Sequence, residues 1–171
     1  ENYAAILRLM QNICYADGKY DIGLGFVRRE LAVRRGKPDE NLAGSLLQLG
    51  TFRQALQNFQ DADSAFRAAV AIVQQYYRPG EFILTEAELT LGVNAYLLGN
   101  EDEAFAIFSG NLRTNQTEIT AVFIQAFQFY GIQLRERGDY RQALEKLELA
   151  SSAYEAQELT NSIEYASRLV Q

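Results

Sequence analysis

The side chains that most often carry out chemistry in proteins are scarce in this 171-residue sequence. Histidine is absent, which removes the usual general base near neutral pH, the Ser-His and Cys-His nucleophile pairs and the commonest metal ligand. Cys14 is the one cysteine, so no intramolecular disulfide can form. The composition therefore favours a protein that is not an enzyme, and it indicates no catalytic residue, no cofactor and no metal site.

The remaining candidates for chemistry each lack part of their motif. Asp61 and Asp63 are two residues apart, but the glycine and the distal glutamate of a calcium loop do not follow them. The sequence also has no Gly-rich phosphate cradle. Residues 115–117 match a glycosylation acceptor, which matters only in a secreted protein. Cys14 falls at an apolar helical position, where we expect a buried and inert thiol.

The charge and the hydropathy of the chain exclude two classes of partner. Sixteen basic residues against 22 acidic ones give a net charge of −6, which opposes direct binding to the phosphates of a nucleic acid. No stretch approaches the roughly 18 uninterrupted apolar residues of a spanning helix, so we expect no membrane insertion. One unpaired cysteine gives no sign of an oxidising compartment, which favours the cytoplasm.

The pattern of apolar residues is that of helices. They recur at three- and four-residue intervals, and the only prolines are Pro38 and Pro79, so the spacing predicts an all-α protein of about nine helices. Four glycines separate successive helical patterns: Gly18, Gly50, Gly99 and Gly138. Glycine suits the left-handed residue that ends a helix, because it has no Cβ to make that conformation costly.

The residues around these glycines repeat as well. After three of them comes a side chain able to cap a new helix, with Gln or Glu three residues later: Thr51–Gln54, Asn100–Glu103 and Asp139–Gln142. Five residues after each glycine stands a small residue, where two helices could approach closely: Gly23, Ala55, Ala104 and Ala143. Nine residues after each stands an apolar one: Val27, Phe59, Phe108 and Leu147.

This recurring pattern resembles the tetratricopeptide repeat (TPR), a helix-turn-helix unit of about 34 residues, over residues 4 to 157. The resemblance implies one right-handed α-solenoid domain (1–171) of about four antiparallel helical hairpins, at about 4–37, 38–78, 81–112 and 117–157. A C-terminal helix at about 160–170 would cap the stack. A helix already under way at Ala4 predicts that the chain is a piece of a longer protein.

The second hairpin is the irregular one, because the glycines are unevenly spaced. The apolar rhythm predicts one long helix over 52–77, and a break at 61–64 would give two shorter helices instead. Residues 110–117, rich in Asn, Thr and Gly, are expected to form the loop before the fourth unit.

In repeats of this kind the first helix of each hairpin lines a concave surface. Counting back from the glycines predicts partner-binding residues on that surface: Arg8, Asn12 and Tyr15, then Glu40, Gly44 and Leu47, then Leu89, Val93 and Tyr96, then Gln128, Ile132 and Arg135. The third unit is the most apolar of these. It would either meet an apolar strip of a partner or be covered by the chain's own neighbouring helices.

The resemblance implies a protein-interaction scaffold that holds a peptide or a segment of a partner protein in the concave groove. One alternative is a regulatory or sensor module of a larger signalling or transcription-control protein. Another is a structural unit that forms homo-oligomers through its third and fourth hairpins, with Phe123, Phe127 and Phe129 supplying the contact area.

Overall fold

A computed structural model describes residues 2–34, 38–112 and 120–169, with side chains described up to 158. Within these residues there are eight α-helices and no strand. Their bounds are α1 Asn2–Ala16, α2 Tyr20–Val33, α3 Glu40–Ala55, α4 Phe59–Val73, α5 Phe82–Leu97, α6 Glu101–Asn111, α7 Ala121–Glu136 and α8 Tyr140–Leu169. None of the described helices is both long and apolar enough to cross a membrane.

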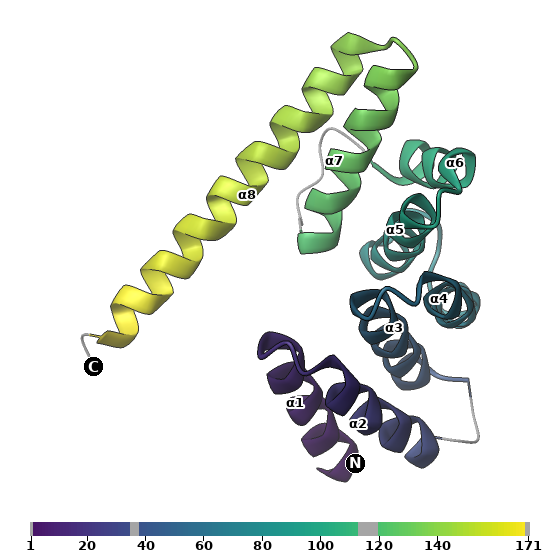
Figure 1. Ribbon diagram of the computed structural model, residues 1–171, viewed down its shortest axis with the longest axis vertical. Helices are drawn as coiled ribbons and strands as arrows, with labels where there is room; N and C mark the ends of the chain where they lie inside the picture. Colours follow the sequence, from purple (N-terminus) through teal and green to yellow (C-terminus); the bar gives the residue numbers. More distant parts are fainter. Residues whose placement is uncertain (1, 35–37, 113–119, 170–171) are drawn as a thin grey trace.

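The helices form four hairpins stacked in chain order. α1 packs on α2, α3 on α4, α5 on α6 and α7 on α8, while α2 meets α3, α4 meets α5, and α7 meets both α5 and α6. Figure 1 shows α1, α3 and α5 on one side of the stack and α2, α4 and α6 on the other. The predicted all-α solenoid of four hairpins is confirmed.

One type of turn closes all four hairpins. In each, the last helical turn makes the paired backbone hydrogen bonds of a Schellman motif, such as Lys19 N–H to the Cys14 carbonyl (2.8 Å). The residue that this motif places in the left-handed region is Gly18, Gly99 or Gly138, as predicted, with φ of 69°, 81° and 85°. In the second hairpin it is Gln57, with φ of 61°.

Gly50, expected at the second turn, lies inside α3 instead. A Cβ added there would be 2.3 Å from Cε1 of Phe66, so the missing side chain lets α3 and α4 approach closely. Thr51 is likewise no helix cap, because its hydroxyl donates to the Leu47 carbonyl (2.9 Å). The chain breaks at 56–58, so both the long helix over 52–77 and the break at 61–64 are wrong.

Counting from Gln57 makes the second unit regular. The small residue five places on is then the buried Ala62, and not Ala55, while the apolar residue nine places on is Phe66, and not Phe59. A second glycine position also appears seven residues before the turn, at Gly50, Gly92 and Gly131. At Gly92 an added Cβ would lie 2.8 Å from Ile107 Cγ2, and at Gly131 it would lie 2.7 Å from Leu147 Cγ.

The first hairpin replaces this glycine contact with a buried polar network. Gln11 stands in the glycine position, and its amide donates to the carboxylate of Glu30 (2.8 Å), which is fully buried. Arg8 and Arg34 each donate to the same carboxylate at 2.9 Å. Burial alone raises the pKa of Glu30, but the hydrogen bonds from Gln11 and Arg34 and the charge of Arg8 outweigh it and lower that pKa below its ordinary value.

The last hairpin ends in one continuous helix. α8 runs without a break from Tyr140 to Leu169. The prediction of a separate capping helix at 160–170 is therefore wrong for residues 160–169, and residue 170 lies outside the described residues. The predicted capping box forms in part at its start, where the Asp139 carboxylate accepts from the Gln142 backbone and side chain. The capping box predicted at Asn100 does not form, because the Asn100 side chain makes no cap hydrogen bond. The loop expected at 110–117 begins later, because Gly110 belongs to α6, and 113–117 fall outside the described residues.

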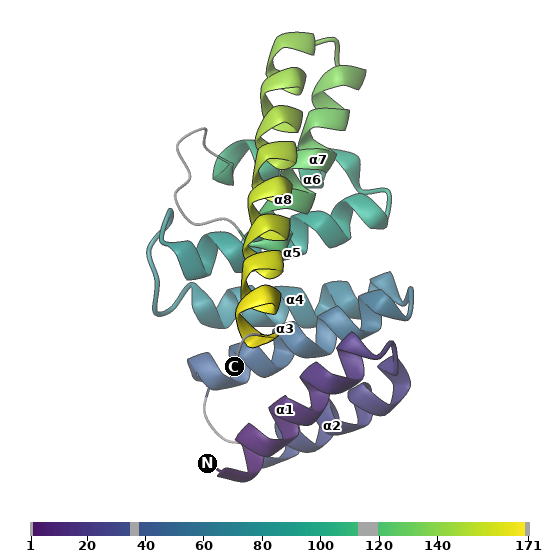
Figure 2. The ribbon, with the colours of Figure 1, turned by 90° about the vertical axis from the view of Figure 1, so that its left-hand side faces the viewer.

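α8 is much longer than its partner α7. α8 has 30 residues, whereas α7 has 16. At 1.5 Å per residue these helices measure about 45 Å and about 24 Å. The second half of α8 therefore continues past α7, and Figure 2 shows it crossing in front of α5 and α3. Apart from the buried residues that pack on α7, the described side chains of this helix are mostly exposed.

Candidate functional groove

One groove of about 480 Å³ collects side chains from five helices. Its walls are α1, α3 and α5 on one side and α7 with α8 on the other, so it lies on the concave side of the stack. Its polar lining residues are Tyr15, Thr51, Gln54, Thr90, Gln125, Gln128, Tyr154 and Gln157. Its apolar lining residues are Ala121, Val122 and Ile124.

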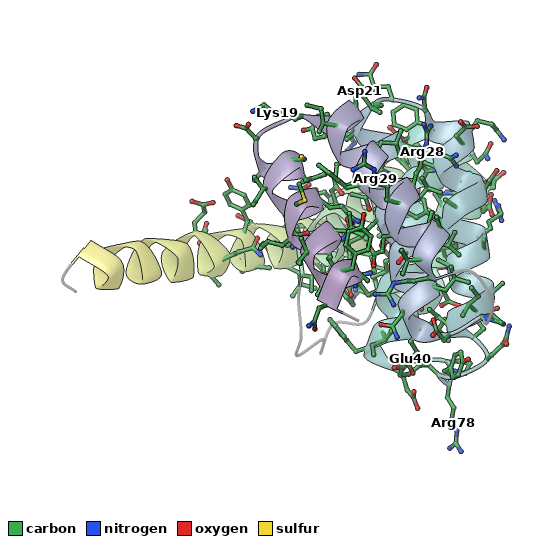
Figure 3. The ribbon with its side chains drawn as sticks, turned by 90° about the horizontal axis from the view of Figure 1, so that it is seen from below. Lys19, Asp21, Arg28, Arg29, Glu40 and Arg78 are labelled. Carbon is green, nitrogen blue, oxygen red and sulfur yellow. The ribbon has the colours of Figure 1, made fainter. Side chains whose placement is uncertain are left out.

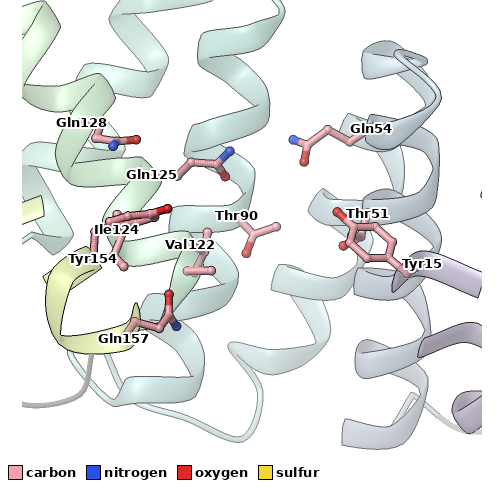
Figure 4. A pocket seen from close by; sticks show the side chains of 11 residues that line it. Tyr15, Thr51, Gln54, Thr90, Val122, Ile124, Gln125, Gln128, Tyr154 and Gln157 are labelled. Atoms are coloured by element: carbon pink, nitrogen blue, oxygen red, sulfur yellow. The ribbon is translucent and has the colours of Figure 1, made fainter. Parts of the chain in front are cut away.

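The groove is polar without being charged. None of the described side chains that line it is acidic or basic. Figure 4 shows Gln54 of α3 and Gln125 of α7 pointing toward one another from opposite walls. A side-chain amide has two donor hydrogens and an acceptor oxygen, so the groove can both donate and accept hydrogen bonds.

Much of this hydrogen-bonding capacity is unused. The side-chain amides of Gln125, Gln128 and Gln157 make no hydrogen bond to another described residue. Gln54 makes a long one to Asn94 (3.4 Å), and Thr90 donates to its own helix at Glu86 (2.8 Å). The amides on the α7 and α8 wall are therefore the groups most available to a ligand.

Tyr15 forms the α1 part of the wall and is held by aromatic contacts. Its ring meets Phe52 edge-on at 5.5 Å and lies 5.4 Å from the ring of Tyr20. Burial, and then the neighbouring Tyr20, raise the pKa of Tyr15 above its ordinary value. The phenol therefore stays neutral and able to donate a hydrogen bond at any physiological pH.

Two of the residues predicted for the concave surface, Tyr15 and Gln128, line the groove. Leu89 and Val93 do not, since they are 0% and 2% exposed and belong to the core shared with α7. Tyr96 of the same helix stacks on Phe129 at 4.3 Å. Of the two alternatives for the third unit, the structure therefore shows the second at Leu89 and Val93, because the chain's own helices cover them.

The other predicted residues lie elsewhere. Arg8 is bound to Glu30, and its guanidinium lies 3.4 Å from where a Cβ of Gly44 would be. Leu47 is partly buried against the α4–α5 core. Asn12 and Arg135 are exposed and Ile132 is half-buried, and none of these three lines the groove.

The self-association surface proposed from sequence is also buried. Phe123 and Phe127 are 0% exposed, and the half-buried Phe129 packs against the same core. These rings belong to a core to which α5, α6, α7 and α8 all contribute. They cannot supply contact area to a second copy without unfolding that core, so this part of the prediction is wrong.

Several groove residues were missed, for two different reasons. Thr51 and Gln54 follow from the original counting rule once the second turn is placed at Gln57, because they stand six and three residues before it. Gln125 lies one helical turn before Gln128 and could have been found from that spacing. Tyr154 and Gln157 had no such signal, since nothing in the repeat pattern indicates that α8 continues across the concave face.

Among the described residues, no group of three or more Cys, Asp and Glu side chains is placed to share a metal ion. No family model matches the sequence, and no curated protein matches it. Comparisons with known proteins therefore rest on solved structures.

Several solved structures share the fold. BtubC (BKLC) from P. vanneervenii has a TM-score of 0.70 at 18% identity, over 91% of this chain and 64% of that one. A single-residue variant of a putative kinesin light chain from Podosopora anserina, with nearly identical TPR-like repeats, has a TM-score of 0.70 at 14% identity, over 90% and 76%. MamA has a TM-score of 0.61 at 18% identity, over 91% and 80%.

These matches show that the chain is a TPR-like helical repeat protein, as the sequence pattern predicted. The chain spans less than two thirds of the length of BtubC. At such low identities the likeness is one of fold alone.

Proposed function

We propose that this protein is an interaction scaffold whose groove binds an extended segment of a partner protein. The observation that carries the proposal is the set of uncharged amide and hydroxyl side chains, drawn from five helices, on one concave surface. The half-buried Val122 lies among them and would contact an apolar side chain of the bound segment.

An extended peptide suits this lining. In an extended chain the backbone N–H and C=O groups are not bonded to each other, so each needs a partner when water is removed. Amides that face each other, such as Gln54 and Gln125, can donate to the carbonyls and accept from the N–H groups. Because the lining has no charge, we expect the bound segment to be neutral at its centre.

A peptide-library selection tests this proposal. Random extended peptides are selected on the whole chain, and the affinity of the best one is measured by calorimetry. Each neutral hydrogen bond contributes about 0.5–1.5 kcal/mol, so Gln125→Ala with Gln128→Ala should weaken binding by about fivefold or more.

The matched control is Gln60→Ala, which removes an exposed amide of α4 outside the groove and should leave the affinity unchanged. Circular dichroism confirms that each variant is folded. Peptides that bind equally well to the double variant would contradict a groove site, as would a selection that yields no binder.

The position of α8 favours a second candidate, the sensor module. Tyr154 and Gln157 on α8 line the groove opposite Tyr15 on α1, so a ligand that touches both walls would draw α8 toward the first hairpin. Small-angle scattering of the chain with its selected peptide distinguishes the two roles. A smaller radius of gyration on binding supports a sensor, and an unchanged one supports a passive scaffold.

A further inference from the structure

The first helix of the stack exposes a stripe of large apolar side chains. Between 39% and 60% of each of them is exposed: Tyr3, Ile6, Leu9, Met10 and Ile13. They fall three or four residues apart, or next to one another, and so share one face of α1. We call this face the α1 stripe. Figure 3 views the molecule from this end, with Lys19 and Asp21 marking the turn from α1 to α2.

The same positions in the later hairpins are covered by the preceding hairpin. Ile13 stands five residues before its turn, and its equivalents Phe52, Asn94 and Gln133 are at most 2% exposed. Ile6 stands twelve residues before its turn. Its equivalents, at most 1% exposed, are Ser45, Ala87 and Ala126. The α1 stripe is thus the face through which every other hairpin stacks.

The contacts across this stacking interface have a fixed register. Asn94 donates to the carbonyl of Phe59, the first residue of α4 (3.0 Å). Gln133 donates to the carbonyl of Glu101, the first residue of α6 (2.8 Å). The residue five before a turn therefore meets the residue two after the preceding turn.

Ring contacts fix a second pair of positions. Phe105, six residues after its turn, lies 5.3 Å from the ring of Tyr130, eight residues before the next turn. Phe108, nine residues after its turn, also approaches Tyr130 at 6.2 Å. The residue eight before a turn thus meets those six and nine after the preceding turn.

The last hairpin exposes the other half of this interface on α8. Two, six and nine residues after Gly138 stand Tyr140, Leu144 and Leu147, which are 71%, 59% and 36% exposed. At the same places in α2, Tyr20 and Leu24 pack against the core that includes Phe52 of α3, and Val27 belongs to that core. We call Tyr140, Leu144 and Leu147 the α8 stripe. α1 and the beginning of α8, which carry the two stripes, lie at opposite ends of the stack (Figure 1).

We propose that a second copy of this chain covers each stripe, with the α8 stripe of one copy stacked on the α1 stripe of the next. In the register of the internal interfaces, Tyr140 then meets Ile13 of the next copy, and Leu144 and Leu147 meet Met10. Because the two surfaces differ, the contact is heterologous, and repetition produces an open chain of copies rather than a closed dimer.

An ion pair in the same register supports this direction of assembly. Within the chain, Arg137, one residue before its turn, pairs with Asp102, three residues after the preceding turn (2.7 Å). The equivalent residues at the two ends of the stack are Asp17, which also pairs with Lys19 of its own chain, and Arg141. In this pair the acidic residue stands before its turn and the basic residue after one, which is the reverse of the internal pair. The two charges are still opposite, so an ion pair can form at the head-to-tail contact.

Sedimentation equilibrium on the whole chain, from micromolar to millimolar concentration, tests the proposal. The wild type should show an average mass that rises above 19.3 kDa and does not level off at a dimer. Ile13→Glu and Leu144→Glu each block one end and should each reduce the mass toward the monomer. Both side chains are more than half exposed, so the fold should persist, and circular dichroism verifies this.

Mixing the two variants gives the decisive result. Ile13→Glu retains an intact α8 stripe and Leu144→Glu an intact α1 stripe, so an equimolar mixture should form a dimer that grows no further. Ile83→Glu, a control in the middle of the stack with 45% exposure, should assemble like the wild type. A monomeric wild type overturns the proposal, and so does a mixture that stays monomeric. An association abolished by only one of the two end variants would show an α1–α1 or α8–α8 contact and also overturn it.

Charge reversal tests the register. Asp17→Arg and Arg141→Asp should each weaken the assembly by severalfold, and the two changes in one chain should restore it. A double variant that assembles no better than the single ones would overturn the head-to-tail register. The sedimentation, mixing and charge-reversal experiments need no ligand in the groove. Failure of the groove proposal therefore leaves the head-to-tail proposal unaffected.

Discussion

Replacing Gly50 with alanine should destabilise the protein, although alanine is the better helix former. Gly50 lies inside α3, where the change to alanine by itself would stabilise the helix by about 0.5–1 kcal/mol. The added Cβ, however, would stand 2.3, 2.5 and 2.7 Å from three atoms of the Phe66 ring. That ring is 0% exposed, so it cannot turn into solvent.

The size of the effect follows from these distances. Carbon atoms in contact are about 3.5–4.0 Å apart, so α4 and the Phe66 ring must retreat by roughly 1 Å. Overpacking of this kind costs about 1–3 kcal/mol. After the gain in helix propensity is subtracted, we expect Gly50→Ala to lower the free energy of unfolding by about 1–2 kcal/mol.

The assay is urea unfolding followed by far-ultraviolet circular dichroism, with Gly25→Ala as the matched control. Gly25 is also inside a helix, and an added Cβ there meets nothing within 4 Å. That variant should be more stable than the wild type by about 0.5–1 kcal/mol. The two substitutions are chemically identical, so their opposite signs isolate the contact with Phe66.

A double variant locates the strain. Phe66→Leu removes part of the ring, so the cost of Gly50→Ala should be smaller by about 1 kcal/mol in its presence. If Gly50→Ala stabilises the protein as Gly25→Ala does, α3 and α4 are not in close contact at Gly50. If its cost is the same with leucine at position 66, the strain lies elsewhere.

Four further substitutions test three other features, each by urea unfolding. Glu30→Gln should lower the free energy of unfolding by about 2–3 kcal/mol at neutral pH, because two partly exposed arginines lose their buried partner. Since the folded pKa of Glu30 lies below the ordinary 4.5, the stabilisation is present above pH 4.5, and the difference from wild type should shrink as the pH falls below it. Gln57→Gly should raise the free energy of unfolding by about 0.5 kcal/mol, because it relieves a left-handed residue, whereas Gly99→Ala should lower it by about 1 kcal/mol. Leu89→Glu should lower it by more than about 3 kcal/mol, because the carboxylate would be buried without a partner; a folded Leu89→Glu variant of normal stability would contradict the core position of this residue.

The sequence alone predicted the fold class and three of the four turns. The period of the apolar residues and the Gly-x-Tyr or Gly-Asn turns are local features, and local steric rules connect them directly to helices and to left-handed caps. The burial of Cys14 followed in the same way from its place on the inner face of α1, and the structure confirms it.

The second turn could not be predicted, because two roles of glycine look alike in sequence. Gly50 permits a close approach of helices, while Gly99 permits a positive φ, and both stand among apolar residues. At the true turn the chain uses Gln57, an L-residue that accepts the left-handed conformation because the Schellman hydrogen bonds hold it. Which role each glycine has depends on the helix that packs against it.

The groove depended still more on tertiary structure. The sequence placed Tyr15 and Gln128 on the concave side, since each is at a fixed distance from its turn. Whether Leu89 is exposed was decided by α7, which packs against α5 and buries it. The wall that carries Tyr154 and Gln157 exists because α8 continues past α7. Periodicity determines which face of a helix is apolar, but only the packed neighbours determine which part of that face remains open.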